Sequence, residues 1–328
     1  MRRREFITLV GGTATMWPIA ARAQQPNKTY RVGLLSGGFA IGPTDERRQS
    51  IVSVLAARGF VEGRNLVFVQ RFADAHPERL DGLLTELKVA NVDVILTFTY
   101  PAALAAKVSA KDVPVVITGA GDPVATGLVD GLARPGGNLT GITELSSDLS
   151  AKRLEILRDA VPGLQRVAML WNATDLGMTL RYHAAESAAR ELGVSVQALG
   201  VREPDDFDEA FAAMTKERPD AILMVSDALT ILNRKRVVEF AATNRLPTIF
   251  ENGSIVREGG LMSYGPKQSE IGELAAGLVA RILQGARPAD LPLELPTRFE
   301  FLVNLKTAKL LAIALPSTLV ARADEVIE

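Results

Sequence analysis

Polar and charged residues follow nearly every buried strand that the sequence predicts, and these side chains are the best placed to bind a ligand. In an open parallel sheet, ligands bind just outside the carboxyl ends of the strands. The residues at those positions come from both halves of the chain: Ser36, Gly37, Thr97, Thr99, Tyr100, Gly119, Asp122, Trp171, Asn172, Ser226, Asp227, Glu251 and Asn252. Their hydroxyl, amide and carboxylate groups favour a small ligand held between two sheets.

Residues 97–100 lead into Pro101, which is expected at the first position of a helix. The hydroxyls of Thr97 and Thr99 would then lie beside free backbone N–H groups at the positive end of that helix. This arrangement suits a ligand carboxylate. The alternative is that Thr99 or Tyr100 only caps the helix.

Asp227 ends a continuous apolar strand and precedes another helix, which is a location suited to a ligand ammonium group. The same location suits a purely structural N-cap. Asp122 and Glu251 are further acidic candidates at strand ends. The ring of Trp171 could stack on an aromatic or apolar ligand, and packing in the core is the competing interpretation.

Enzyme motifs are not found in this sequence. Residues 119–124 begin like a dinucleotide-binding fingerprint, but the third glycine position is Val124, and Pro123 interrupts the expected helix start. Nucleophile-elbow, P-loop and zinc-protease motifs are absent from the sequence, and His76 and His183 have the surroundings of surface residues. We therefore expect no catalytic residue, no cofactor and no metal site. A hydrolase that uses a carboxylate pair is the enzymatic alternative.

The composition is that of a globular protein. The 328 residues are 47% hydrophobic and 23% charged, enough for two domains with separate cores. The net charge of -1 leaves no positive excess to neutralise a phosphate backbone, so nucleic acid is a poor candidate partner. The absence of cysteine excludes disulfides and thiolate metal sites.

The first 23 residues have the pattern of an export signal. Arg2, Arg3 and Arg4 precede an apolar stretch at residues 6–20, and Ala-Arg-Ala at residues 21–23 is a small-residue cleavage pattern. The paired arginines ahead of a bulky apolar residue are similar to a twin-arginine signal. The apolar stretch is short for a membrane anchor. We expect cleavage near Ala23 and a periplasmic protein.

Strands and single amphipathic helices alternate along the rest of the chain. In the first half, strands are expected at residues 30–35, 66–72, 92–96 and 113–117, with helices starting near Thr44, Pro77 and Pro101. In the second half, strands are expected at residues 167–170, 194–199, 221–225 and 247–250. Continuous aliphatic strands of this kind indicate parallel sheets covered on both faces. The sequence therefore predicts two doubly wound lobes.

Short strands near residues 140, 262 and 300 are candidates for three crossings between the lobes, which would act as a hinge. A helix is expected at residues 267–283. The expected lobes are residues 24–143 with about 264–298, and residues 144–263 with about 299–328.

Six stretches of the chain resemble one known family, the ABC transporter substrate-binding proteins of the tryptophan/tyrosine type. They are GFVEGRN at 59–65, PAALAAK at 101–107, GDPV at 121–124, LARPGGNLTG at 132–141, GGLMSYG at 259–265 and NLKTA at 304–308. They occur in family order through nearly all of the chain after the signal. The resemblance implies the class I periplasmic binding-protein fold.

The resemblance also implies a role, which is capture of a small molecule between two lobes and delivery to the permease and ATPase subunits of an ABC importer. An amino acid or another carboxylate is the expected ligand, and a monomer is expected. A periplasmic sensor that passes a ligand signal to a membrane partner would have the same fold and is the main alternative.

Overall fold

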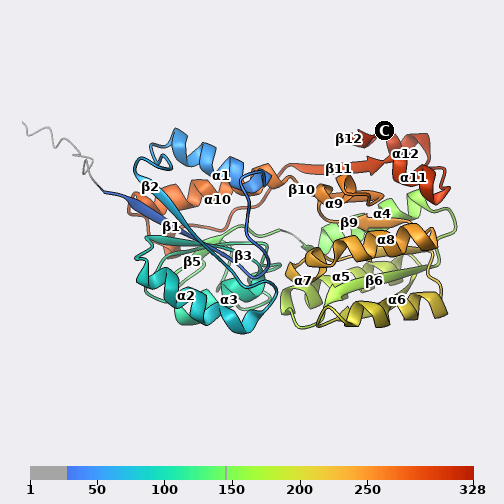
Figure 1. Ribbon diagram of the computed structural model, residues 1–328, viewed down its shortest axis with the longest axis horizontal. Coiled ribbons are helices and arrows are strands. Elements are labelled where there is room, and N and C mark those ends of the chain that lie inside the picture. The colour runs from blue at the N-terminus through green and yellow to red at the C-terminus, as the bar shows by residue number, and fades with distance from the viewer. Residues whose placement is uncertain (1–27, 145) are drawn as a thin grey trace, which may run out of the picture.

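Residues 28–144 and 146–328 are described by the computed structural model, and they form two lobes that lie side by side (Figure 1). The expected signal peptide at residues 1–23 lies outside the described residues. Each lobe is a sheet with helices on both faces, as the alternating strand and helix pattern predicts.

The first sheet has five parallel strands within the described residues, in the order β2-β1-β3-β4-β5. They are β1 Tyr30–Ser36, β2 Leu66–Phe72, β3 Val94–Phe98, β4 Val115–Thr118 and β5 Leu139–Gly141. The helical segments of this lobe are α1 Glu46–Ala57, η1 Pro77–Arg79, α2 Leu80–Val89, α3 Tyr100–Ser109, α10 Gln268–Leu283 and η2 Pro288–Asp290.

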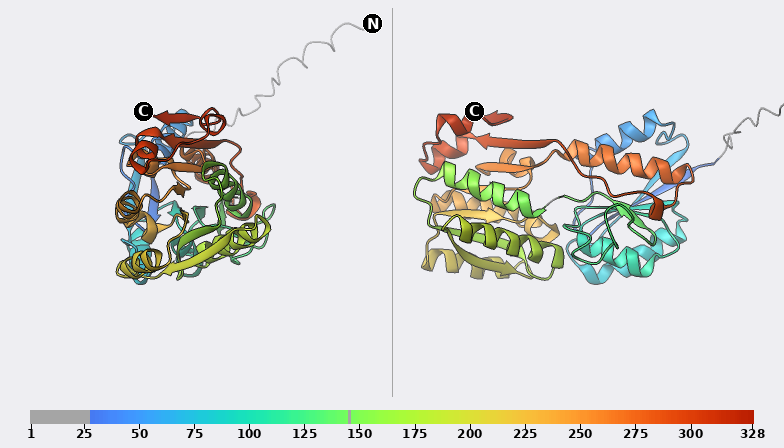
Figure 2. Two further views of the ribbon diagram at one scale, coloured as in Figure 1. Left: turned by 90° about the vertical axis from the view of Figure 1, so that its right-hand side faces the viewer. Right: turned by 180° about the vertical axis from the view of Figure 1, so that it is seen from behind.

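The core of the first lobe has two layers because successive strand residues point to opposite faces. Leu96 belongs to the layer beneath α1 and α10, whereas Ile95 belongs to the layer beneath α2 and α3. Helix α10 follows most of the second lobe in sequence but lies beside α1 in the first lobe (Figure 2). A Cβ atom on Gly272 would lie 2.5 Å from the Arg47 carbonyl oxygen, so a glycine is needed for the close approach of α1 and α10.

The second sheet has seven strands within the described residues, in the order β12-β11-β10-β9-β8-β6-β7. They are β6 Arg166–Asn172, β7 Ser195–Val201, β8 Ala221–Met224, β9 Thr248–Phe250, β10 Met262–Pro266, β11 Phe299–Asn304 and β12 Glu325–Ile327. The helices are α4 Ser146–Ala160, α5 Leu176–Glu191, α6 Asp206–Lys216, α7 Ala228–Leu232, α8 Arg234–Asn244, α9 Gly253–Arg257, α11 Leu305–Leu311 and α12 Ser317–Val320. The sheet is parallel except for the antiparallel pair β10 and β11.

Three segments cross between the lobes, and they are hydrogen-bonded to one another. The first runs from Thr143 into α4, and the Thr143 amide donates to the Glu294 carbonyl oxygen at 3.0 Å. The second lies between β10 and α10, and the third lies between η2 and β11. The Lys267 amide of the second donates to the Arg298 carbonyl oxygen of the third at 2.9 Å. The short strands expected near residues 140, 262 and 300 are β5, β10 and β11. Each is paired within a sheet and lies next to a crossing segment, so the strands flank the crossings and do not form them.

The lobes are in contact on the side of the strand ends. A Cβ atom on Gly38 would lie 3.2 Å from Ala228 Cβ, and one on Gly121 would lie 3.3 Å from Gly177 Cα. A Cβ atom on Gly177 would also lie 3.4 Å from Tyr100 Cβ. We call the surface formed by these five residues the seam. The two lobes are thus closed against each other at the seam.

Candidate functional site

The loops after the first-lobe strands lie at the seam and are held by local hydrogen bonds. Ser36 Oγ accepts from the Gly38 amide at 3.1 Å. A side chain on Gly37 would overlap Thr99 Oγ1, so the loops after β1 and β3 are tightly packed. Thr99 caps α3, with its Oγ1 accepting from the Ala102 amide at 3.4 Å, and has the unusual backbone angle φ 153°. Gly119 follows β4 with a φ of 63°, a conformation that favours glycine.

Thr97 lies inside the first lobe. It pairs with Leu35 and Ile117, which belong to the core layer beneath α2 and α3. Its side chain is fully buried, and its Oγ1 has no hydrogen-bond partner among the described residues. The strand alternation therefore directs this hydroxyl toward the helices, whereas the sequence interpretation placed it beside a ligand.

The side chains of two of the expected site residues accept hydrogen bonds from backbone amides a few residues further along the chain. Asp122 is exposed, and its Oδ1 accepts from the amides of Val124 and Ala125 at 3.0 Å each. Asn252 Oδ1 accepts from the Ser254 amide at 2.9 Å at the start of α9. Loop geometry accounts for both side chains.

Trp171 packs in the core of the second lobe. Its ring stacks on Tyr182 of α5, with 3.8 Å between the ring centroids and 8° between the planes. Burial, followed by the hydrogen bond to Glu186, raises the pKa of Tyr182 to about 12. The packing alternative from the sequence thus describes what the ring does in this structure.

Asp227 and Asn172 join the ends of two neighbouring strands. Asn172 Nδ2 donates to Asp227 Oδ2 at 2.5 Å. Asp227 Oδ1 accepts from the Thr230 amide and hydroxyl, both at 2.9 Å, and so caps α7. Burial raises the pKa of Asp227, which is 6% exposed. The adjacent Ser226 has a buried Oγ without a partner among the described residues.

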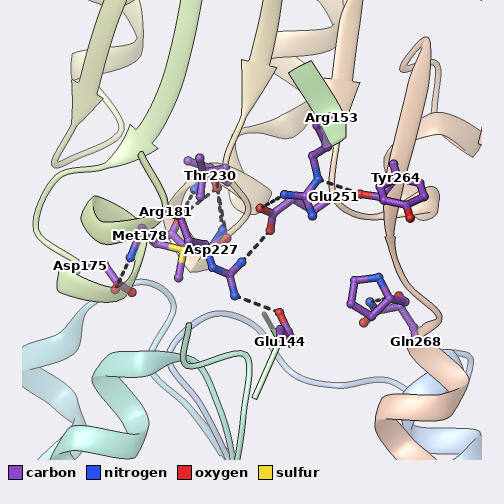
Figure 3. A network of polar contacts seen from close by, with 12 residues as sticks. Glu144, Arg153, Asp175, Met178, Arg181, Asp227, Thr230, Glu251, Tyr264 and Gln268 are labelled. Atoms are coloured by element: carbon purple, nitrogen blue, oxygen red, sulfur yellow. Dashed lines mark hydrogen bonds and ion pairs between the residues drawn. The ribbon is translucent and has the colours of Figure 1, made fainter. Parts of the chain in front are cut away.

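Glu251 belongs to a buried network of ion pairs that the sequence interpretation did not include (Figure 3). Its two carboxylate oxygens accept from Arg153 Nη1 at 2.9 Å and from Arg181 Nη1 at 2.8 Å. Arg181 Nη2 donates to Glu144, which lies on the first crossing, at 2.9 Å. Arg153 Nε donates to the Tyr264 carbonyl oxygen on β10 at 2.7 Å. The network therefore links two of the crossing regions to the interior of the second lobe.

The charges of this network balance each other. The side chains of Arg153 and Arg181 are only 3% and 5% exposed. Burial lowers the pKa of Arg153. Burial also acts to lower the pKa of Arg181, but Glu251 and Glu144 outweigh that effect and leave the pKa above its ordinary value. Arg181 Nε has no acceptor among the described residues.

Asp175 is a second buried carboxylate that the sequence interpretation missed. It caps α5, with its Oδ1 accepting from the Met178 amide at 3.1 Å, and it is 2% exposed. Burial, with a smaller contribution from the charge of Asp227, raises the pKa of Asp175 to about 7. An Asp-x-x-Met sequence at a helix start indicates a cap, but it gives no sign that the other lobe covers the carboxylate.

Metal binding and membrane crossing find no support in the described part of the chain. No group of three or more histidine, aspartate or glutamate side chains there is arranged to hold a metal ion. None of its helices combines the length and the apolar character that a membrane span requires.

Two doubly wound lobes, three crossings and strand-end loops that meet at a seam define the class I periplasmic binding-protein fold. The sequence profile of the family described as ABC transporter substrate binding protein matches residues 42–327. The chain belongs to this family of ABC transporter substrate-binding proteins.

Three known proteins are similar to this chain over most of its length. A curated relative from Clostridioides difficile, named tyrosine-binding protein, is 24% identical over 268 residues, covering 81% of this chain and 76% of that protein. The crystal structure of a conserved domain protein from Vibrio cholerae is 26% identical with a TM-score of 0.85, covering 91% of this chain and 100% of that chain. An ABC domain from Streptococcus pneumoniae in complex with L-Trp is 22% identical with a TM-score of 0.84, covering 92% and 100%.

Proposed function

We propose that this protein is the periplasmic receptor of an ABC importer and that it captures a small amine-bearing solute between its lobes. The observation that carries the proposal is the seam, where the loops after the strands of both lobes meet. Ser226 Oγ and Arg181 Nε, both in the second lobe, are buried without a hydrogen-bond partner among the described residues. Buried polar groups normally have such a partner. Permease and ATPase subunits are the proposed partners of a monomeric receptor.

An aromatic amino acid is the proposed ligand class. The names of two similar proteins mention tyrosine and L-Trp. Asp227 offers the negative charge for an ammonium group, and Thr99 with the first turn of α3 offers donors for a carboxylate. Calorimetric titration with aromatic and aliphatic amino acids and their deaminated analogues tests this class. Binding of a neutral or purely acidic compound alone would refute the amino acid and leave the receptor role intact.

Substituting leucine for Gly177 is expected to weaken ligand binding by about fivefold to 150-fold, because overpacking costs roughly 1–3 kcal/mol. An added Cβ would lie 3.1 Å from the Ala120 carbonyl oxygen, and the rest of the leucine would enter the first lobe. Gly177 lies in the first turn of α5, and the second-lobe atom nearest to its added Cβ is Asp175 Oδ1 at 3.2 Å, so within the second lobe only this side chain should have to shift. Small-angle scattering should show a larger radius of gyration than the wild type.

Gly82→Leu is the matched control, since Gly82 lies in α2 with no atom within 4 Å of its added Cβ. It should leave both the scattering curve and the ligand affinity unchanged. A Gly177→Leu protein that closes and binds like the wild type would show that closure of the seam is not needed for binding.

Export predicts a defined N-terminus. The folded protein recovered from the periplasm of the native cell should begin at or near Gln24, because the small-residue pattern ends at Ala23. N-terminal sequencing of the purified protein measures this directly. Intact Met1 on folded native protein would contradict export with cleavage. Lysine substituted for both Arg3 and Arg4 should keep the protein in the cytoplasm if the twin-arginine route is used.

A further inference from the structure

The carboxylate of Asp175 lies where the first lobe covers the second. The added Cβ of Gly177, two residues further along α5, would be 3.2 Å from Asp175 Oδ1 and 3.4 Å from Tyr100 Cβ. The charge of Asp175 also raises the pKa of Tyr100 across the seam, after the larger effect of burial. Separation of the lobes would therefore return the Asp175 carboxylate to water.

No cation is dedicated to Asp175 among the described residues. Its partners are the backbone amides of Gly177 and Met178. Of the charged groups whose fields reach it, Asp227 repels its charge, and Arg181 attracts it. The guanidinium of Arg181, however, already forms ion pairs with Glu144 and Glu251. Asp175 is thus a buried acid whose negative charge is only weakly compensated in the closed protein.

An ionised carboxylate without a partner is costly to bury. We propose that Asp175 is a charge-selecting residue, over which the lobes close only when a proton or a cationic group of the ligand neutralises its carboxylate. A solute with an amine then closes the lobes at neutral pH, whereas closure over a solute without an amine requires protonation of the Asp175 carboxylate. The ligand class in this proposal rests on the proposed function, whereas the effect of Asp175 on closure can be measured without ligand.

A second observation points to a polar ligand group in the same region. Arg181 is one of the charged residues whose field acts on Asp175, and its Nε is buried without an acceptor among the described residues. A carboxylate in need of a cation and an N–H in need of an acceptor together suit a zwitterion. The chemistry therefore favours an α-amino acid over its deaminated acid.

The sign of the pH effect follows from linkage. The closed protein has a pKa of about 7 at Asp175, whereas an open, hydrated carboxylate has the ordinary value near 3.8. A raised pKa in the closed state means that protonation favours closure, and that this advantage is lost as the pH rises toward 7 and above. Without ligand, the closed-to-open ratio should fall by about tenfold between pH 6 and pH 8.

The experiment uses a disulfide across the seam, because the natural chain has no cysteine. In Gly38→Cys/Ala228→Cys, the two Cβ atoms would be 3.2 Å apart in the closed protein, near the usual disulfide separation of about 3.5–4.5 Å. The rate of disulfide formation with a fixed oxidant is measured from pH 6 to pH 8. The same pair combined with Asp175→Asn corrects for the pH dependence of thiol chemistry.

The rate of the cysteine pair alone, divided by the rate of the pair combined with Asp175→Asn, should fall by about tenfold across this range. Asparagine is neutral at every pH and still caps α5, so the ratio isolates the titration of the carboxylate. A constant ratio would overturn the proposal. Failure of both proteins to form the disulfide at pH 6 would overturn the closed seam on which it depends.

The ligand part is tested at pH 8 with L-tyrosine and 3-(4-hydroxyphenyl)propanoate, which differ only in the amine. The wild type should prefer L-tyrosine, and Asp175→Asn should reduce that preference by about tenfold or more. An unchanged preference would overturn charge selection by Asp175. If neither compound bound the wild type, the aromatic amino acid of the proposed function would be refuted, and the disulfide rates would decide the role of Asp175 separately.

Discussion

Replacing Asp227 with asparagine is expected to weaken an amine-bearing ligand by about thirtyfold to several-thousandfold. Loss of one partner from a buried, charge-assisted hydrogen bond costs roughly 2–5 kcal/mol, because the other group stays desolvated. Asparagine can still accept from the Thr230 amide, so α7 keeps its cap. Its amide nitrogen would, however, face the Asn172 Nδ2 that now donates to Oδ2 at 2.5 Å. We therefore also expect a loss of about 1–3 kcal/mol in unfolding free energy.

Calorimetric titration of the two proteins with the amino acid panel measures the affinity, and urea unfolding measures the stability. Asp122→Asn is the matched control, since Asp122 also accepts from nearby backbone amides but is exposed. It should bind the ligand like the wild type. Equal losses of affinity in the two variants would contradict a specific contact between Asp227 and the ligand.

Replacing Arg153 with methionine is expected to reduce the unfolding free energy by about 3–5 kcal/mol, the usual result of removing one partner from a buried ion pair. Arg153 neutralises one oxygen of Glu251 and also donates to the Tyr264 carbonyl oxygen. Methionine would fill part of the volume but leave both acceptors without their donor. Trp171, in the core of the same lobe, provides the fluorescence signal for unfolding.

Lys152→Met is the matched control on the same helix. Lys152 forms an exposed pair with Glu155, so its loss should change stability by no more than about 1 kcal/mol. Adding Glu251→Gln to the Arg153→Met protein should lower the unfolding free energy by less than Glu251→Gln does in the wild type. The Glu251 charge has already lost one of its partners in the Arg153→Met protein. Purely additive losses would show that Arg153 and Glu251 do not act as a pair.

The sequence predicts the parallel core of both lobes well. Continuous aliphatic runs bounded by glycine and polar residues indicate buried strands, and the strand expected at residues 66–72 is β2 without change. The helix expected at residues 267–283 is α10, which begins one residue later. Strand direction was harder to predict, because the apolar pattern of β11 is the same in a parallel and an antiparallel pair.

The candidate site was only partly predictable. The strand-end rule identifies Asp227 and Asn172, which the structure joins by a hydrogen bond. It cannot identify Arg153 and Arg181, because each lies within a helix whose sequence also suits a solvent-facing charge. The acidic partners of these arginines, Glu251 and Glu144, are distant in the chain, and no local pattern carries that information.

Both lobes are discontinuous in sequence, and this has a consequence for how the protein is made. The first sheet is complete at residue 141, but one of its faces is covered only in part, by α1, until α10, at Gln268–Leu283, has been synthesised. The second sheet is likewise incomplete until β11 and β12, which follow α10 in sequence, have been synthesised. Domains usually fold during synthesis from the N-terminus onward. Here each lobe needs a segment that is made only after the other lobe has begun, so its apolar strands stay exposed to chaperones for longer than those of a continuous domain.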